Sequence, residues 1–390
     1  MKIQKQQWGV EDYFPEEIVD KILLKLPVKE VIRCSAVCKL WNSLIKNPAF
    51  IQTHLNNQTH DGVSELLLLS SHQSDDLFWD NPAALFGQYS NLRNPIHNNN
   101  NSSSNWTKGI SYQVVGTCNG LVCLSLYSFD RDPCPPVILW NPSIRKFGFL
   151  PSPSLATDCC RNESYYFCYD SRIDDYKVVR IVERIHREVE VWSLASGGAW
   201  KSLNNNVPAD FSPYRHCHAF VNGAFHWVQS RPTKEEEEEE FAVSVVALDM
   251  VDESFRNVEI RQGWSGPPMI SRYHGDGDQC WLALFELQGD SCFDLWVMKE
   301  YGVAESWTKL FNVCLLGSPE EEPRIEPFGF TKSGQVVVRM GRDEEFNSFK
   351  SYDPKDKQFR DFGNQAYDYY FMDSFVESLV LLGQTNVFSY

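Results

Sequence analysis

A pattern of short strands that returns about every 50 residues dominates the sequence after residue 112. Each unit pairs an apolar, alternating run with a turn and a second strand, as in residues 137–147. Repeats of this length that contain only strands are typical of β-propeller blades. The sequence therefore predicts a mostly β fold with a propeller, in which five blades are visible. The anchor residues of the five units are Trp140, Trp192, Leu248, Trp296 and Tyr352.

The region before these units predicts a sixth blade. Residues 66–86 contain apolar runs broken by turn residues. We expect a strand over Glu377–Leu382 to pair with strands near Leu66, because closing the ring removes exposed strand edges. The expected propeller thus has about six blades. Hairpin turns at Asn119-Gly120 and Asn222-Gly223 fit this fold, because both residue types tolerate positive φ.

A helical pattern precedes the strands. Apolar residues at positions 18, 19, 22, 23 and 26 form one helical stripe. Pro15 suits the first helical position, and Pro27 ends the helix because proline lacks the amide hydrogen. Two further short helices are expected to complete a three-helix module within residues 13–55. A core of about 40 residues is insecure alone, so these helices pack on the next domain or against another protein.

The sequence of this module has a specific pattern. Residues 14–29 read FPEEIVDKILLKLPVK and residues 33–45 read RCSAVCKLWNSLI, followed by Pro48 and Phe50. The pattern resembles an F-box over its whole length, although the family usually has leucine in place of Phe14. The resemblance implies a Skp-type adaptor as partner and, through it, cullin. The residues expected to face the adaptor or to shape that face are Phe14, Pro15, Ile18, Val19, Ile22, Leu23, Leu26, Pro27, Val28, Val31, Val37, Cys38 and Trp41. The sequence does not separate adaptor contacts from residues of the helices' own core.

The strand-rich part also resembles a family. Residues 118–124 read CNGLVCL, residues 139–143 read LWNPS and residues 376–379 read VESL. These motifs are similar to the F-box-associated β-propeller of plant F-box proteins, which resembles kelch propellers, although the double glycine of kelch repeats is absent. The expected division is a polar leader at 1–12, the F-box at 13–55, a linker at 56–64 and the propeller at 65–390.

Charge and cysteine content restrict the class of partner. The net charge of −16 repels phosphate backbones, so nucleic acid is not an expected partner. The first ten residues lack an apolar signal core, and no apolar run approaches the ~20 residues of a membrane helix. We therefore expect a protein of the cytoplasm, the nucleus or both, without membrane contact. In these compartments the 12 cysteines should stay reduced.

The sequence offers little for bond chemistry. His216-Cys217-His218 would place two imidazoles on one side of a strand, but a metal site needs three or four ligands, so a structural role is favoured. No glycine-rich phosphate loop and no hydrolase motif occurs. We therefore expect no catalytic residue, no metal and no cofactor.

The two resemblances together imply a function. They imply a substrate-recognition subunit of a Skp-cullin-F-box ubiquitin ligase, which binds the adaptor through the F-box and a target protein through the propeller, and so promotes ubiquitination and proteasomal degradation. Two alternatives remain open: an adaptor-bound scaffold without ubiquitin transfer, and a sugar-binding or enzymatic propeller. Long connections between strands share one face of the ring, where recognition usually occurs. Tyr214, Arg215 and Trp264 are the expected target anchors on that face.

Overall fold

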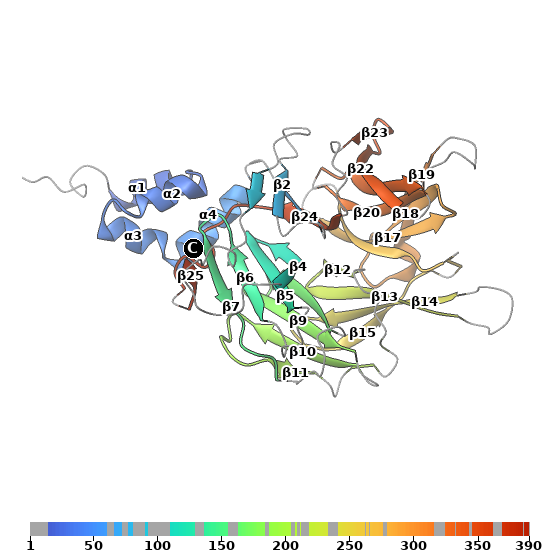
Figure 1. Cartoon of the computed structure of the whole chain (residues 1–390), viewed down its shortest axis with the longest axis horizontal. Helices are drawn as coiled ribbons and strands as arrows, with labels where there is room; N and C mark the ends of the chain where they lie inside the picture. Colours follow the sequence, from blue (N-terminus) through green and yellow to red (C-terminus); the bar gives the residue numbers. More distant parts are fainter. Residues whose placement is uncertain are drawn as a thin grey trace, which may run out of the picture.

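Helices come first and strands follow (Figure 1). The computed structural model describes residues 15–60, 66–71, 77–80, 90–92, 110–128, 136–154, 163–183, 187–203, 207–208, 211, 218–232, 241–261, 263–264, 266–275, 279–315, 324–331, 333–342, 345–361, 369–384 and 386–389. The helices are α1 (Glu16–Leu23), α2 (Val28–Cys34), α3 (Lys39–Ile45) and α4 (Pro48–His60). No helix among the described residues has the length and apolar character needed to cross a membrane.

The helical module has four helices, so the expectation of three was wrong. Asn47 caps α4, because its side-chain Oδ1 accepts a hydrogen bond from the amide of Ala49 at 2.9 Å, and Pro48 occupies the first helical position. The helix then continues to His60, into the segment that was expected to be a linker. Its inner side is held by Phe50 and Leu55, which are both buried.

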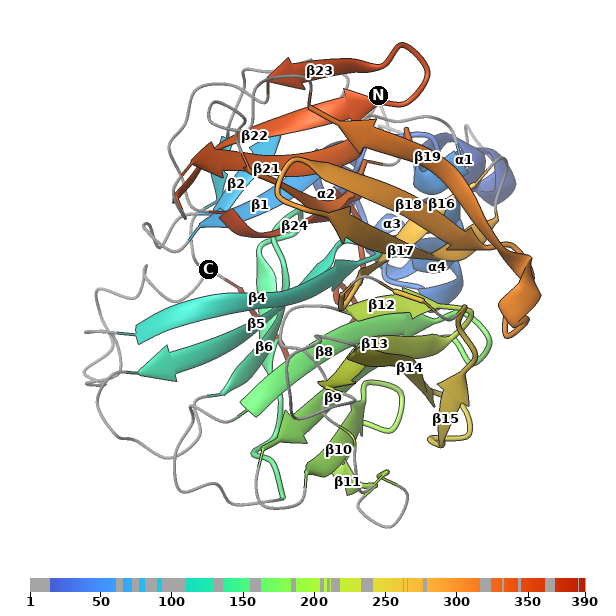
Figure 2. The same cartoon turned by 90° about the vertical axis from the view of Figure 1, so that its right-hand side faces the viewer.

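The described strands form six antiparallel sheets, which follow one another around a ring in Figure 2. In sequence order the strands are β1 (Leu66–Ser71), β2 (Leu77–Asp80), β3 (Ser90–Leu92), β4 (Ile110–Cys118), β5 (Leu121–Ser128), β6 (Val137–Asn141), β7 (Lys146–Phe149), β8 (Glu163–Asp170), β9 (Asp175–Val182), β10 (Glu188–Ser193), β11 (Lys201–Ser202), β12 (His218–Val221), β13 (Ala224–Pro232), β14 (Phe241–Asp249), β15 (Phe255–Val258), β16 (Met269–His274), β17 (Cys280–Gln288), β18 (Cys292–Met298), β19 (Trp307–Cys314), β20 (Arg324–Phe330), β21 (Val336–Arg342), β22 (Glu345–Asp353), β23 (Gln358–Asp361), β24 (Tyr369–Phe375) and β25 (Phe388–Ser389).

Five sheets, not six, are built from four consecutive strands, and they match the five repeats seen in the sequence. Each repeat supplies the third and fourth strands of its sheet, for example β6 and β7 or β18 and β19. The first of these sheets gains a fifth strand, because β25 pairs with the outer edge of β7. The repeat pattern in the sequence therefore predicted these strand pairs correctly.

The remaining sheet is a composite, with the order β24-β1-β2-β3. Its closing strand is β24 rather than the expected strand over Glu377–Leu382. Residues 376–380 follow β24 without forming a strand, and they run between the ring and the helices, with Val380 in the ring and Leu379 in the helical core. Ring closure by the end of the chain was thus predicted correctly, but the pairing residues were not.

The core of the ring is divided into clusters between neighbouring sheets. Trp140 and Trp192 are buried within the sheets, as expected for residues that fill the blades. Arg172, from the β8–β9 turn, forms ion pairs with Asp170 and with Asp249 at the end of β14, at 2.6 and 3.1 Å. One of its nitrogens also donates to the carbonyl of Gly223 in the β12–β13 turn at 2.6 Å. This arginine therefore ties two neighbouring sheets together at the face that carries the tight turns.

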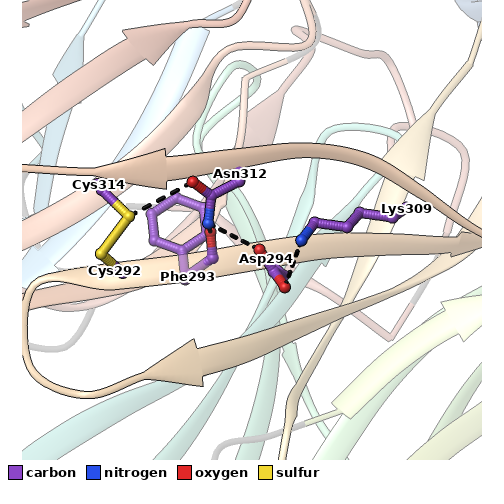
Figure 3. Close-up of a disulfide and its surroundings, with 6 residues drawn as sticks. All are labelled: Cys292, Phe293, Asp294, Lys309, Asn312 and Cys314. Atoms are coloured by element: carbon purple, nitrogen blue, oxygen red, sulfur yellow. Dashed lines mark hydrogen bonds and ion pairs between the residues drawn. A yellow bond between two sulfur atoms is a disulfide. The ribbon is translucent and has the colours of Figure 1, made fainter.

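Two cysteines form a disulfide, so the expectation that all cysteines stay reduced was wrong. Cys292 begins β18 and Cys314 ends β19, and the strand register places them directly opposite each other (Figure 3). Their Cα atoms lie 4.2 Å apart, which is the spacing of closely opposed residues in an antiparallel pair. Beside the disulfide, the carboxylate of Asp294 accepts hydrogen bonds from Lys309 and Asn312 at 2.7 and 2.8 Å.

Candidate protein-binding surfaces

Helix α1 has one buried side and one exposed side. Val19 and Leu23 are buried among the helices, whereas Ile18 and Ile22, one turn apart, are 44% and 51% exposed. Pro15 lies at the N-cap of α1 and not at the first helical position that was expected for it. Glu16 and Glu17 occupy the first turn, where carboxylates favour the positive end of the helix dipole. The exposed isoleucines therefore belong to a well-formed helix that presents an apolar stripe outward.

A second exposed apolar site lies between α2 and α3. Val37 and Leu40 are 54% and 39% exposed, while Val28 and Val31 on α2 are buried. Cys38 caps α3, because its sulfur accepts a hydrogen bond from the amide of Trp41 at 3.5 Å. The cap fixes the turn that carries Val37 outward.

The structure thus divides the residues expected at the adaptor face into two groups. Of those it describes, Val19, Leu23, Val28 and Val31 are buried in the helical core. The others are at least partly exposed: Pro15, Ile18, Leu26, Ile22, Pro27, Val37, Cys38 and Trp41. Phe14 lies outside the described residues. Leu40 was missed; it lies in the first turn of α3, directly after Lys39, and is 39% exposed.

The exposed aliphatic side chains are concentrated in the helices. Among the described residues, four of the nine exposed large hydrophobic side chains lie within residues 15–60. The other five are spread over the much longer β region: Phe149, Ile173, Val251, Val303 and Phe388. Soluble proteins seldom leave several large apolar side chains exposed on so small a module unless another molecule covers them. We call Ile18, Ile22, Val37 and Leu40 the helical apolar surface.

The two faces of the ring differ in the length of their strand connections and in their contact with the helices. Because the strands of each sheet are antiparallel, the β4–β5 and β6–β7 turns lie on one face, and the longer connections lie on the other. The helices are on the face with the tight turns: Ile144 of the β6–β7 turn packs against the helical core, and Ile51 of α4 packs on the ring. In Figure 2 the helices lie behind the ring, so the face with the longer connections is turned toward the viewer.

Trp264 is the only expected target anchor whose position is described; Tyr214 and Arg215 lie outside the described residues. Trp264 is 9% exposed, and its indole nitrogen donates to the carbonyl of Arg261 at 2.7 Å. The guanidinium of Arg261 lies 4.1 Å from the ring centres of both Trp264 and Trp296. The sequence could not reveal this sandwich, because Arg261 and Trp264 lie in the β15–β16 connection whereas Trp296 lies in β18. A role of Trp264 in target binding stays a prediction.

The histidine run that was considered as a metal site lies mostly outside the described residues. Only His218 of the His216-Cys217-His218 run is described, and its ring packs edge-on against Tyr166 with 4.7 Å between centroids. Within the described ranges, no three His, Cys, Asp or Glu side chains gather as a metal ion would need. Burial raises the pKa values of the Cys123 and Cys168 thiols, which keeps them protonated and weakly nucleophilic.

Comparison with known families matches both parts of the chain. The profile of the F-box associated beta propeller domain matches residues 64–381, and the profile of the F-box domain matches residues 13–53. Among curated relatives, an F-box/kelch-repeat protein of Arabidopsis thaliana is 28% identical, over 77% of this chain and 79% of the relative. The F-box protein CPR1 of the same plant is 29% identical, over 83% of this chain and 78% of the CPR1 chain.

Solved structures align with the chain only distantly. A puromycin-hydrolysing peptidase of Mycobacterium tuberculosis aligns with a TM-score of 0.40 and 14% identity, over 77% of this chain and 46% of its own. The SapL1 lectin aligns with a TM-score of 0.37 and 10% identity, over 78% of this chain and 96% of the lectin chain. Scores this low carry no argument about function, whereas the propeller profile spans most of the 390 residues. The chain belongs to the plant F-box proteins that carry an F-box-associated β-propeller domain behind an F-box domain.

Proposed function

We propose that this protein is the substrate-recognition subunit of a Skp-cullin-F-box ubiquitin ligase and acts in the cytoplasm, the nucleus or both. The helical apolar surface binds a Skp-type adaptor, and the propeller binds a target protein. The protein performs no bond chemistry itself; it holds a lysine of the target close to the ubiquitin thioester, which raises the effective concentration of the two reactants. Ubiquitination then directs the target to proteasomal degradation.

The observation that carries the proposal is the helical apolar surface. Its four side chains are each about half exposed, so covering one contributes on the order of 1 kcal/mol. Together they contribute roughly 4 kcal/mol before the cost of association is subtracted. The half-buried Leu26 and Trp41 lie on the same module and extend the area that an adaptor can cover.

The ring is proposed to bind targets on the face with the longer connections. Long loops on a rigid scaffold are the usual place for recognition. The helices occupy the opposite face, so a target on the loop face leaves the adaptor site free. Tyr214, Arg215 and Trp264 are the proposed anchors.

A double substitution tests the adaptor site. Ile18→Asp with Ile22→Asp places two carboxylates in the proposed contact, where unpaired charges cost several kcal/mol on burial. We expect adaptor affinity to fall at least about 100-fold in a pull-down or calorimetric titration with recombinant adaptor. The helical core keeps Val19 and Leu23, so the helices stay folded.

The matched control is Val251→Asp with Val303→Asp, which changes two exposed aliphatic side chains of the propeller turns. This control should bind the adaptor as the unchanged protein does. Equal adaptor binding by both double variants would refute the proposed site. Affinity purification with the Ile18→Asp/Ile22→Asp variant, followed by mass spectrometry, should retain targets and lose the adaptor and cullin. A ubiquitination assay on the retained targets then separates a ligase subunit from a scaffold.

A further inference from the structure

The segment that follows β24 links the two domains through side chains that pack in two different cores. We call residues 376–384 the clasp. Leu379 is fully buried in the helical core with Leu23 and Ile45, and Leu382 packs against the same core. Val380 and Leu381 are buried in the ring, in a cluster with Leu139. Four successive residues of the clasp therefore divide their contacts between the helices and the propeller.

Polar contacts fix the clasp to the ring. The side-chain amide of Asn141, at the end of β6, donates to the carbonyls of Ser378 at 3.0 Å and Val380 at 2.8 Å. The Asn141 side chain is fully buried, and its Oδ1 accepts from the amide of Ser143 at 3.0 Å. Lys146 Nζ adds a bond to the carbonyl of Leu382 at 3.2 Å. One buried asparagine thus holds the backbone of the clasp at two points.

Close backbone approaches complete the joint on both sides. A Cβ atom at Gly120 in the β4–β5 turn would lie 2.3 Å from Ser378 Oγ and 2.6 Å from the carbonyl of Val376. A Cβ atom at Gly383 would lie 2.9 Å from the carbonyl of Lys46, at the end of α3. Leu381 adopts φ +73°, a left-handed conformation that leucine rarely takes and that its surroundings must impose. The clasp is therefore pressed between the ring and the helices with no room for a side chain at either glycine.

From this arrangement we propose that the clasp is a positioning element that fixes the orientation of the F-box relative to the propeller, with Gly120, Asn141 and Leu379 as its positioning residues. The inference rests on the proposed function, because a fixed orientation determines which lysines come within reach of the ubiquitin thioester. Helix α4 also meets both cores, because Phe50 packs in the helical core, Leu55 packs in the ring and Ile51 contacts both. The clasp is a second joint, which inserts four successive side chains into the two cores and is held at its backbone by Asn141.

The test uses Gly120→Ala in the full chain, with Gly334→Ala as matched control. Both glycines have nearly the same φ, +80° and +81°, so both variants place alanine in a left-handed backbone conformation. The new methyl group meets Ser378 only in Gly120→Ala; at Gly334 the nearest atom is 4.0 Å away. Dyes placed at the exposed positions of Ser43 in α3 and Lys355 in the β22–β23 turn report the orientation by single-molecule energy transfer. Asn141→Asp is the second variant, because it keeps the acceptor for Ser143 and replaces the donor by a repelling carboxylate.

We expect one narrow distribution of energy-transfer efficiency for the wild-type protein and for Gly334→Ala. Gly120→Ala and Asn141→Asp should lose the single distribution while adaptor binding is retained. In a reconstituted ligase without a target, ubiquitin can be transferred to lysines of the propeller itself. The set of propeller lysines that become ubiquitinated should differ between these two variants and the wild-type protein. Unchanged distributions in both variants would overturn the proposal. A fall in the melting temperature of the propeller that is much larger in Gly120→Ala than in Gly334→Ala would also overturn it, because the clasp would then belong to the ring's core. If the wild-type protein does not bind the adaptor, the proposed function is refuted. The energy-transfer measurement needs no adaptor, so it still decides the role of the clasp.

Discussion

His226, in β13, is a fully buried histidine between two fixed partners. Its Nδ1 lies 3.3 Å from the carbonyl of Ala219, which can only accept, so Nδ1 carries the proton. Its Nε2 then accepts from the hydroxyl of Tyr301 at 2.7 Å. Burial lowers the pKa of His226 to about 4, and the nearby charge of Arg256 acts in the same direction. The fold therefore requires a neutral ring at this position.

This requirement makes stability depend on pH. Above the ordinary pKa of 6.5 the ring is neutral in both states, and its contribution is complete. As the pH falls from 6.5 to about 4, the unfolded chain binds the proton first, so the free energy of unfolding decreases. The loss amounts to about 3 kcal/mol on the scale of 1.36 kcal/mol per pKa unit. His226→Gln should be less stable at pH 7 but lose less stability between pH 6.5 and 4, as measured by denaturant unfolding. Parallel pH curves for the two proteins would contradict this assignment.

At the scale of elements, the disulfide crosslinks strands β18 and β19 at one end of the pair. The bond joins Cys292 to Cys314, 22 residues apart in sequence. A crosslink across a loop of that length stabilises by about 3 kcal/mol in the chain-entropy description. Cys292→Ser with Cys314→Ser should therefore lower the free energy of unfolding by up to about 3 kcal/mol under oxidising conditions. With a thiol reductant present, the variant and the unchanged protein should unfold at nearly the same denaturant concentration. An equal difference with and without reductant would show that packing at these positions, not the disulfide, is responsible.

Elements with a local period could be predicted from the sequence, and pairings between distant segments could not. The stripe at Ile18 and Ile22 and the strand pairs around Trp140 follow from spacing within one element. The disulfide, the β24–β1 pairing and the insertion of Leu379 into the helices depend on which distant segments meet. Strand β9 shows a further limit: all eight of its residues are buried. It includes Arg180, which pairs with Glu163 and Glu190 at 2.9 and 2.7 Å. Alternation of polar and apolar residues gives no sign of such a buried ion triad.

At the scale of the whole molecule, β24 completes the ring. It pairs with β1 from Leu66↔Phe375 to Ser71↔Tyr369, and it lies in contact with β20 and β4. It therefore occupies in its sheet the place that β4, β8, β12, β16 and β20 hold as the first strands of theirs. Without β24, the strand β1 would present an unpaired edge in the middle of the molecule, and unpaired edges promote association between chains.

Two truncated chains separate ring closure from the clasp. A chain that ends after Phe375 keeps β24 and lacks the clasp and β25, whereas a chain that ends before Tyr369 lacks all three. We expect the first chain to keep a cooperative thermal transition of the propeller at a lower temperature, because every sheet keeps its four ring strands while β25 and the ring contacts of Val380 and Leu381 are lost. The second chain should aggregate or lose the cooperative transition, because the β1 edge is exposed and the contacts of β24 with both neighbouring sheets are gone. Circular dichroism melting and light scattering measure both outcomes. If the chain that ends before Tyr369 melts as cooperatively as the chain that ends after Phe375, then β24 does not hold the ring closed.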